Sequence, residues 1–268
     1  MEKGKVAFKF AGVPIYESDL SKEAVARLNK ELVNHIEVIM VEISEIGILT
    51  EKTLKEMLLV KLKEGNDLKV IESILSNTNL KEIDEESWKD LSKHENWGIR
   101  RIAAQSRFAT EERLKEMLKY EVKAGRDLEV IEAILLNSHL KEVDEESWRG
   151  LSEHGSCEIR KIAAQSRFAT EERLKEMLKY EVKAGRDLEV IEAILLNSHL
   201  KEIDEGSWKD LSKHESWRIR EIAAQSRFAT EERLEEMIKR EVKVGKDLDV
   251  INAIISNLNF KNDEETSS

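Results

Sequence analysis

The chain is predicted to be all-α, assembled from tandem helical units, and three observations in the sequence indicate this fold class. The segment 102–142 recurs without one change at 162–202, which defines a repeat of 60 residues. Apolar residues within each copy follow helical spacing, and capping residues and glycines recur at the same places. A fixed period of this length is typical of stacked units that share one elongated core, in contrast to a closed domain around a single active site.

Composition narrows the class of protein further. Charged residues make up 37% of the 268 residues, aromatic residues make up 5%, and there is one proline, which is the profile of a soluble, helix-rich chain. The net charge of −11 argues against broad electrostatic capture of nucleic acid or anionic lipid. Cys157 is the single cysteine, which excludes an intrachain disulfide and a thiolate metal site. Because no apolar run reaches the roughly 18 residues of a membrane span and the N-terminus lacks a signal peptide, we expect a cytoplasmic protein.

Residues 1–20 differ from the rest and are expected to form an extended arm or cap. Val6, Phe8 and Phe10 recur at period two, and Pro14 is the only proline, which together predict a short strand at 5–10. We expect this arm to cover the first hairpin. A helix from about 20 to 33 is expected to open the repeat domain, residues 21–262, and residues 263–268 are predicted to be a polar tail.

Each full copy is predicted to contain four short helices, and such copies start at 84, 144 and 204 after a diverged copy at 49–82. In the copy 84–143 the helices are expected near 85–93, 97–106, 111–124 and 128–137. Their N-caps are expected to be Asp84, Asn96, Thr110 and Asp127, with Asp144, Ser156, Thr170 and Asp187 in the next copy. Gly125 and Gly185 are expected to end the third helix in the left-handed conformation. A weaker repeat of about 30 residues indicates helical hairpins, about eight of which fit the chain.

The segment IRRIAAQSRFATEERLKEML, at 99–118, resembles the leucine-rich repeat variant family and its HEAT-like relatives. Repeats of that family carry an apolar-Arg pair, an Ala-rich helix, a polar turn ending in Thr and an acidic helix with leucines. The resemblance covers about 220 of the 268 residues, although this chain lacks the usual Asn-Pro turn and has longer half-repeats. The resemblance implies a curved, right-handed α-solenoid that is used for binding, and it implies no chemistry.

Three histidines, His94, His154 and His214, recur once per copy and invite a metal-site interpretation. Zinc ligands must lie about 2 Å from one ion, whereas residues two hairpin layers apart lie on the order of 20 Å from each other. We therefore expect structural histidines that cap the first helix of each copy or bond to a neighbouring helix. The same distances disfavour a catalytic site assembled across copies, and no GxSxG, HExxH or P-loop string occurs. Neither a cofactor nor enzyme activity is expected.

Repeated arginines have two interpretations. Arg100, Arg160 and Arg220 follow Ile in each copy, and a second set follows the Ser of the turn. The favoured interpretation is an internal ladder, in which each guanidinium bonds carbonyls or a carboxylate of the adjacent hairpin. The alternative is a nucleic-acid-binding stripe along a phosphate backbone, weakened by Glu111 and Glu112. Its residues are Arg107, Arg167, Arg227, Arg113, Arg173 and Arg233.

Differences among copies identify a candidate partner-binding surface. Seven positions of 86–101 hold the same residue in the equivalent segments 146–161 and 206–221. One of them is Trp88, which is predicted to be a core residue together with its counterparts Trp148 and Trp208. The variable positions are either exposed and tolerant of change, or they form a ridge that contacts a partner, with Trp97 and Trp217 as largely exposed anchors. The candidate residues are Lys89, Asp90, Lys93, Trp97, Arg101, Arg149, Glu153, Glu158, Lys161, Lys209, Asp210, Lys213, Trp217 and Arg218.

The favoured hypothesis is a non-catalytic repeat scaffold or adaptor that binds a protein or peptide and makes no membrane contact. Nucleic-acid binding is the alternative. A DNA glycosylase of the HEAT-like kind would need a unique acidic and aromatic pocket, which identical copies do not provide. The identity of two copies is also typical of an engineered or consensus-based array.

Overall fold

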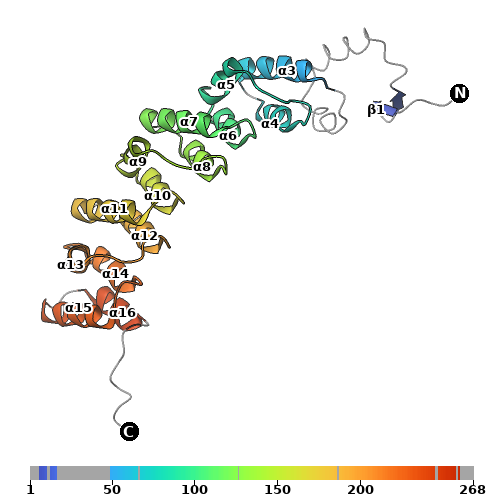
Figure 1. Ribbon diagram of the computed structural model, residues 1–268. Coiled ribbons are helices and arrows are strands. Elements are labelled where there is room, and N and C mark those ends of the chain that lie inside the picture. Colours follow the sequence, from blue (N-terminus) through green and yellow to red (C-terminus); the bar gives the residue numbers. More distant parts are fainter. Residues whose placement is uncertain are drawn as a thin grey trace. The chain divides into compact units, whose positions relative to one another are not determined.

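The computed structural model describes residues 6–10, 13–16, 49–65, 67–125, 127–185, 187–244, 247–257 and 259. These residues form fourteen α-helices and one two-stranded hairpin (Figure 1). The repeats in the described part of the chain are therefore helical, as predicted, and the contacts between their helices are consistent with the predicted helical repeat. The chain divides into two compact units, unit 1 with residues 1–121 and 129–141, and unit 2 with residues 122–128 and 142–268.

Each full copy folds into four helices, whose bounds lie within one residue of the predicted ones. Copy 1 (84–143) contains α5 (Glu85–Ser92), α6 (Trp97–Gln105), α7 (Glu111–Ala124) and α8 (Leu128–Leu136). Copy 2 (144–203) contains α9 (Glu145–Ser152), α10 (Cys157–Gln165), α11 (Glu171–Ala184) and α12 (Leu188–Leu196). Copy 3 (204–262) contains α13 (Glu205–Ser212), α14 (Trp217–Gln225), α15 (Glu231–Val244) and α16 (Leu248–Ser256). The diverged copy contributes α3 (Glu51–Glu64) and α4 (Leu68–Ser76).

Capping residues begin and end these helices largely as predicted. The carboxylate of Asp84 accepts a hydrogen bond from the amide of Ser87 at 2.8 Å, which satisfies one free donor of α5. Gly185 ends α11 with a φ of 60°, in the left-handed region that favours glycine. Asp187 is the N-cap residue of α12 as predicted, but the predicted hydrogen bond from its side chain to a helix amide is absent, and the carboxylate pairs instead with the guanidinium of Arg160.

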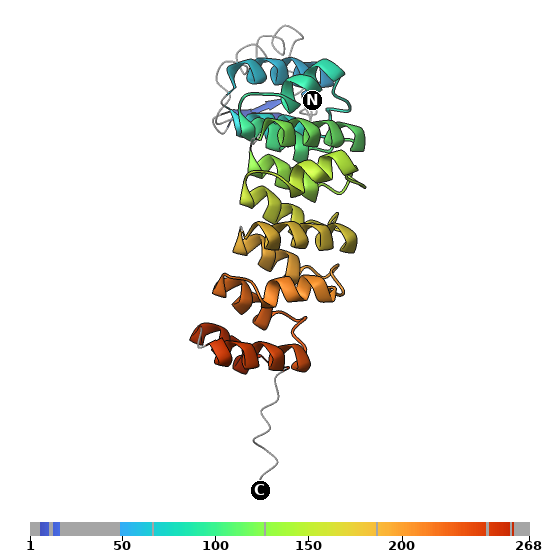
Figure 2. The same ribbon diagram turned by 90° about the vertical axis from the view of Figure 1, so that its left-hand side faces the viewer.

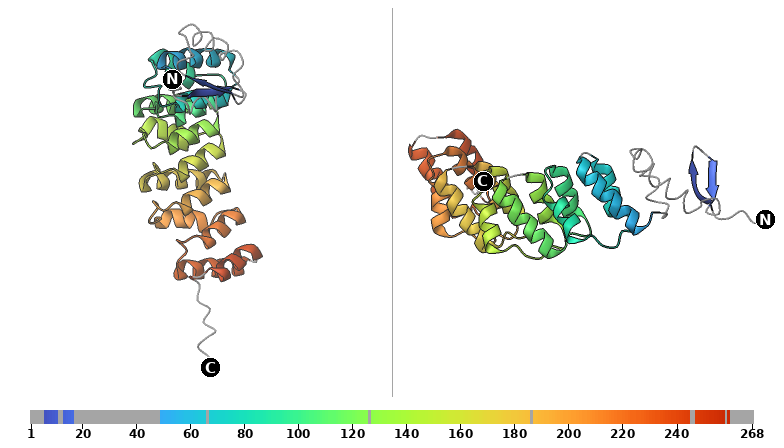
Figure 3. Two further views of the ribbon diagram at one scale, coloured as in Figure 1. Left: turned by 90° about the vertical axis from the view of Figure 1, so that its right-hand side faces the viewer. Right: turned by 90° about the horizontal axis from the view of Figure 1, so that it is seen from above.

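Two layers of helices are seen within unit 2. The odd-numbered helices α9, α11, α13 and α15 lie on one side and the even-numbered helices on the other (Figure 1). Figure 2 faces the odd-numbered layer, and the left panel of Figure 3 faces the even-numbered layer. Apolar side chains such as Leu174, Ile191 and Ile219 are buried between the layers. In unit 1, α3 packs on α4 and α5 packs on α6 in the same manner.

The predicted core tryptophans are confirmed, because Trp88, Trp148 and Trp208 are each only 2% exposed. Trp97 is exposed, as expected. Trp217 is half-buried, so the prediction that it is largely exposed is wrong. The guanidinium of Arg218 lies over the Trp217 ring, 5.4 Å from its centroid, and shields part of it.

The N-terminal hairpin consists of β1 (Val6–Phe10) and β2 (Val13–Tyr16), which pair antiparallel with Phe10 opposite Val13. The first strand matches the predicted strand at 5–10, and the second one, in which Pro14 pairs with Lys9, lies outside the predicted range. The predicted helix at 20–33, the boundary at 20 and the tail at 263–268 lie outside the described residues. Among the helices that the structure describes, none is long and apolar enough to cross a membrane.

Candidate partner-binding site

A buried ion pair recurs in every full copy and joins the second helix to the third. Nε of Arg100 on α6 lies 2.6 Å from Oε1 of Glu121 on α7, and both side chains are fully buried. The same atoms are 2.6 Å apart in Arg160–Glu181 and 2.8 Å apart in Arg220–Glu241. These contacts confirm the predicted internal ladder for the first set of arginines. Removal of either partner would leave an uncompensated buried charge.

The acidic partners of this ladder are residues that sequence analysis does not identify. Glu121 shares a helix face with Leu114, Met117 and Leu118, all of which are buried. A carboxylate that recurs at a core-facing position is the signal that could have revealed it, because a buried charge needs a partner. Its counterparts are Glu181 and Glu241.

The repeated histidines make structural hydrogen bonds, and His94 links its copy to the preceding one. Nδ1 of His94 accepts a hydrogen bond from the amide of Asn96 at 3.0 Å. Nε2 therefore carries the proton and donates it to the carbonyl of Leu62 at 2.9 Å, which fixes the neutral tautomer. His154 and His214 accept the same bond from the amides of Ser156 and Ser216 at 3.0 Å.

These contacts agree with the predicted structural role of the histidines. No group of three His, Cys, Asp or Glu side chains is placed to hold a metal ion within the described residues. Burial, followed by the positive charge of Arg160, lowers the pKa of His154.

The arginines of the predicted nucleic-acid stripe have partners inside the protein. Nη2 of Arg107 donates to the carbonyl of Asn77 at 2.6 Å, and Arg227 donates to the carbonyl of Asn197 at 2.6 Å. Arg167 lies over the ring of Phe168, 4.8 Å from its centroid. These contacts use guanidinium groups that phosphate binding would require.

The remaining arginines of the stripe stack on the core tryptophans. The guanidinium of Arg113 lies 4.8 Å from the ring centroid of Trp88 and donates to the carbonyl of Phe108 at 3.0 Å. Arg173 and Arg233 make the same stacking contact, at 4.8 Å, with Trp148 and Trp208. Five of the six arginines thus contact another helix or the turn beside it, and nucleic-acid binding through this set stays a prediction.

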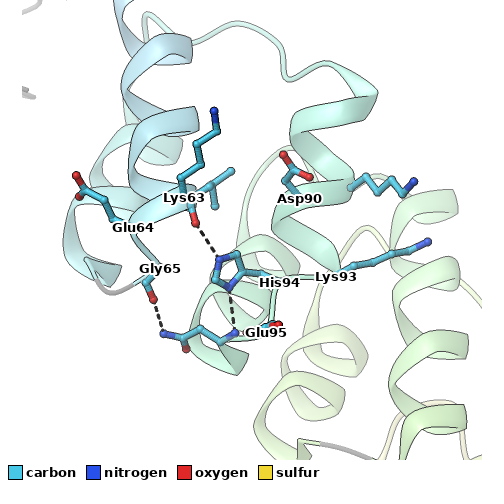
Figure 4. Close-up of a pocket in the computed structure, with 10 residues that line it drawn as sticks. Lys63, Glu64, Gly65, Asp90, Lys93, His94 and Glu95 are labelled. Atoms are coloured by element: carbon cyan, nitrogen blue, oxygen red, sulfur yellow. Dashed lines mark hydrogen bonds between the residues drawn. The ribbon is translucent and has the colours of Figure 1, made fainter.

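Open hollows lie where the end of a long helix meets the first helix of the next copy. Hollow 1, with a volume of about 720 Å³, lies between the C-terminal end of α3 and helix α5 (Figure 4). Its α5 side consists of Lys89, Asp90 and Lys93, and the turn from 94 to 96 closes one end. Hollow 3, numbered after copy 3, has a volume of about 1060 Å³. It lies at the equivalent place between α11 and α13, 120 residues later in the sequence. Its α13 side consists of Lys209, Asp210 and Lys213.

Three lysines stand at the same positions in both hollows. In hollow 1 they are Lys63, Lys89 and Lys93, and in hollow 3 they are Lys183, Lys209 and Lys213. Within the part of the chain that the structure describes, none of these six forms an ion pair. Asp90 and Glu95, like Asp210 and Glu215, add negative charge beside them. The hollows therefore present unpaired charge of both signs.

The equivalent place in copy 2 has different chemistry. Gly150 and Gly155 stand where copies 1 and 3 carry Asp and Glu, and Glu153 replaces a lysine. A Cβ atom on Gly150 would lie 2.4 Å from Cγ1 of Val122, so only glycine permits this approach of α9. A smaller depression of about 500 Å³ is lined there by residues of α9, including Arg149.

The other candidate residues do not line these hollows. Trp97 and Arg101, one helical turn apart on α6, form a cation–π pair at 5.4 Å. Lys161 on α10 pairs with Glu189 at 2.7 Å. Glu158 accepts a hydrogen bond from Ser156 at 2.6 Å. The variable positions thus include residues of odd-numbered helices at the hollows and residues of even-numbered helices outside them, and a single binding ridge stays a prediction.

Two leucines at the ends of even-numbered helices are also exposed. Leu136 and Leu196, the last residues of α8 and α12, are each 72% exposed. Both follow two buried apolar residues, so the run of three exceeds the width of one helix face. Three consecutive apolar residues in a helix are therefore the sequence signal that could have predicted an exposed position for Leu136 and Leu196.

The chain matches no protein-family model, and no similar curated protein or solved structure is found.

Proposed function

We propose that this protein is a non-catalytic repeat scaffold that binds a protein partner through hollow 1 and hollow 3. One observation carries the proposal, namely that the contacts holding the helices together are kept in every copy, while the residues at the hollow position differ in copy 2. Arg100 and His94 belong to the kept set, and each has fixed partners in the protein. Lys93 belongs to the changing set and has no ion-pair partner among the described residues. A rigid frame with variable, unpaired side chains is suited to recognition.

The lysines favour a partner that carries acidic side chains. An exposed ammonium group attracts a carboxylate, and such pairs at a wet rim set association rate and specificity more than affinity. Binding should therefore weaken as the salt concentration rises, because exposed charges are screened. The substitution of Lys by Glu at 153 would direct such a partner away from copy 2.

The repeats are further proposed to continue as one right-handed α-solenoid of about eight hairpins. Seven hairpins, α3–α4 through α15–α16, are present in the described residues, and the helix predicted from the sequence near 20–33 would contribute to an eighth. A compact chain of 268 residues would have a radius of gyration of about 18 Å. Small-angle X-ray scattering should give a clearly larger value, and a crystal structure would test the hand.

A capture experiment tests the proposed partner site. The full chain is immobilised, exposed to nuclease-treated lysate of its source, and compared with a variant carrying Lys93→Glu and Lys213→Glu, the residue of copy 2. Lys69→Glu on α4 is a matched control, because Lys69 is exposed and lines neither hollow. The wild type and the control should retain the same protein, and the double variant should lose it.

Two results would count against the proposal. Equal retention by the double variant would remove the hollows as the site. Retention of a protein only from lysate that has not been treated with nuclease would instead favour nucleic-acid binding.

A further inference from the structure

A groove with a volume of about 630 Å³ lies along the even-numbered helices of unit 2, where α14 and α16 pack side by side (Figure 1). Leu196, the last residue of α12, lines it together with Glu221 and Gln225 of α14 and Asp249 of α16. Leu196 is 72% exposed, and Leu136 at the same position of copy 1 is also 72% exposed, although two further copies follow it in the sequence. The exposure of this leucine is therefore a property of its position within a copy.

Two carboxylates in this groove are not neutralised by the protein. Neither Glu221 nor Asp249 forms an ion pair within the part of the chain that the structure describes. Arg227 also lines the groove, but its guanidinium donates to the carbonyls of Asn197 and Leu200. The charge that the groove offers to a partner is therefore negative. We call this site the acidic groove, and its members are Leu196, Glu221, Gln225 and Asp249.

The charge at the position of Glu221 differs in every full copy. Copy 1 carries Arg101 there, and copy 2 carries Lys161. In copy 2, Nζ of Lys161 lies 2.7 Å from a carboxylate oxygen of Glu189, which is the counterpart of Asp249. Copy 3 has two carboxylates at the two places of this ion pair. Because like charges repel, a cation supplied by a partner would be stabilised there, as Lys161 is in copy 2.

We infer that the acidic groove binds a peptide segment of another protein, in which an aliphatic side chain is flanked by lysine or arginine. The aliphatic side chain would cover Leu196 and remove its apolar surface from water. The cation would lie between Glu221 and Asp249. The exposed amide of Gln225, which makes no side-chain hydrogen bond within the described residues, can donate to and accept from the peptide backbone.

The acidic groove differs from hollow 1 and hollow 3 in both place and charge. The hollows lie beside odd-numbered helices and present lysines, whereas the acidic groove lies on even-numbered helices and presents carboxylates. The two kinds of site should therefore select peptides of opposite charge. The inference does not depend on the function proposed for the hollows.

Selection from a library of random peptides displayed on phage, with the full chain as the target, tests this inference. One class of selected peptides should carry Leu, Ile or Val beside Lys or Arg. A synthetic, fluorescein-labelled peptide of this class should bind the wild type in fluorescence anisotropy, and more weakly as the salt concentration rises. Glu221→Lys, which installs the residue of copy 2, should weaken its binding at least about tenfold, because the new cation repels the peptide and can pair with Asp249.

A second substitution tests the apolar contact. Leu196→Ser installs the residue found at the equivalent positions Ser76 and Ser256, and it should weaken binding of the same peptide about tenfold. Leu136→Ser is the matched control, since Leu136 is equally exposed but lies on α8, outside the groove, and it should bind the peptide like the wild type. Circular dichroism should show the same helix content in all variants.

Each other result counts against the inference. A selection without the basic class of peptides overturns it. A selection that yields only acidic peptides, which Lys93→Glu with Lys213→Glu no longer binds, also overturns it while the function proposed for the hollows stands. Unchanged affinity for the basic peptide in Glu221→Lys and Leu196→Ser rejects the groove as its site. If one of these two variants loses helix, the affinity of the other decides.

Discussion

Arg160 illustrates how one residue holds several elements in place. Its guanidinium binds Glu181 on α11 at 2.6 Å and the carbonyl of His154, at the end of α9, at 2.6 Å. It also pairs with Asp187, which precedes α12. A planar group with five donors can serve three neighbours at once, which lysine could not do.

The first prediction concerns this buried charge. Arg160→Met should lower the free energy of unfolding by about 3–5 kcal/mol, because Glu181 is then left buried without its partner. Adding Glu181→Leu should restore most of the loss, since a matched apolar pair of similar volume is well tolerated in place of a buried ion pair. Urea unfolding of the two variants measures both values. An equal loss of unfolding free energy in the single and double variants would show that the unpaired carboxylate of Glu181 is not the cause of the loss.

A second residue-scale prediction concerns pH. Because burial and Arg160 lower the pKa of His154, the folded protein binds the proton more weakly than the unfolded chain. Neutral His154 therefore makes its full contribution to the free energy of unfolding above its usual pKa of about 6.5. This contribution is lost as the pH falls from that value toward the lower pKa of the folded state. Urea midpoints should fall over this acidic range in the wild type and fall less in His154→Gln. If the urea midpoints of the two proteins fell by the same amount with pH, protonation of His154 would not be the cause of the loss.

At the scale of elements, the spacing between helices depends on single small residues. Helix α9 approaches the end of α7 because Gly150 has no side chain, whereas the equivalent helices α5 and α13 carry Asp90 and Asp210. Gly155, in the turn after α9, has no atom within 4 Å of an added Cβ. Two glycines of one copy therefore have different structural roles.

A matched pair of substitutions tests this difference. Gly150→Asp, which installs the residue of copies 1 and 3, should cost about 1–3 kcal/mol because it overpacks against Val122. Gly155→Glu, the matching change in the turn, should stay within about 0.5 kcal/mol of the wild type. Thermal and urea unfolding measure both changes. A tolerated Gly150→Asp would mean that α9 can move away from α7 without cost.

Local signals in the sequence predict the helices well, and they predict the surfaces less well. The bounds of α7 follow from Thr110, Glu111 and Gly125, which lie within or beside the helix. Hollow 1 joins Lys63 to Lys89 through the packing of α3 on α5, which no local pattern specifies. The role of Asp187 is missed for the same reason, because its partner Arg160 is 27 residues away.

At the scale of the whole molecule, one copy should be removable without loss of folding in the rest of the chain. Deletion of 102–161 joins Arg101 to Ile162 in register, and each remaining helix keeps neighbours of the same type. Stability in repeat arrays is approximately a sum of unit and nearest-neighbour terms, so the shorter chain should fold, with a smaller dependence on urea. Circular dichroism and urea unfolding measure this outcome. A deletion product without helix would show that folding requires contacts between copies that are far apart in the sequence.

The identity of 102–142 with 162–202 means that two successive joints present the same surface to the copy that follows. Val122 meets Gly150 at one joint, and Val182 lines hollow 3 with Asp210 at the next, so the first two helices of a copy alone decide what kind of hollow forms. A gene encoding such a chain can misalign with itself by one 60-residue step during recombination and still yield a protein in register. Unequal exchange would then reorder the hollows while every helix interface survives, so the recognition surface can diversify faster than the framework that carries it.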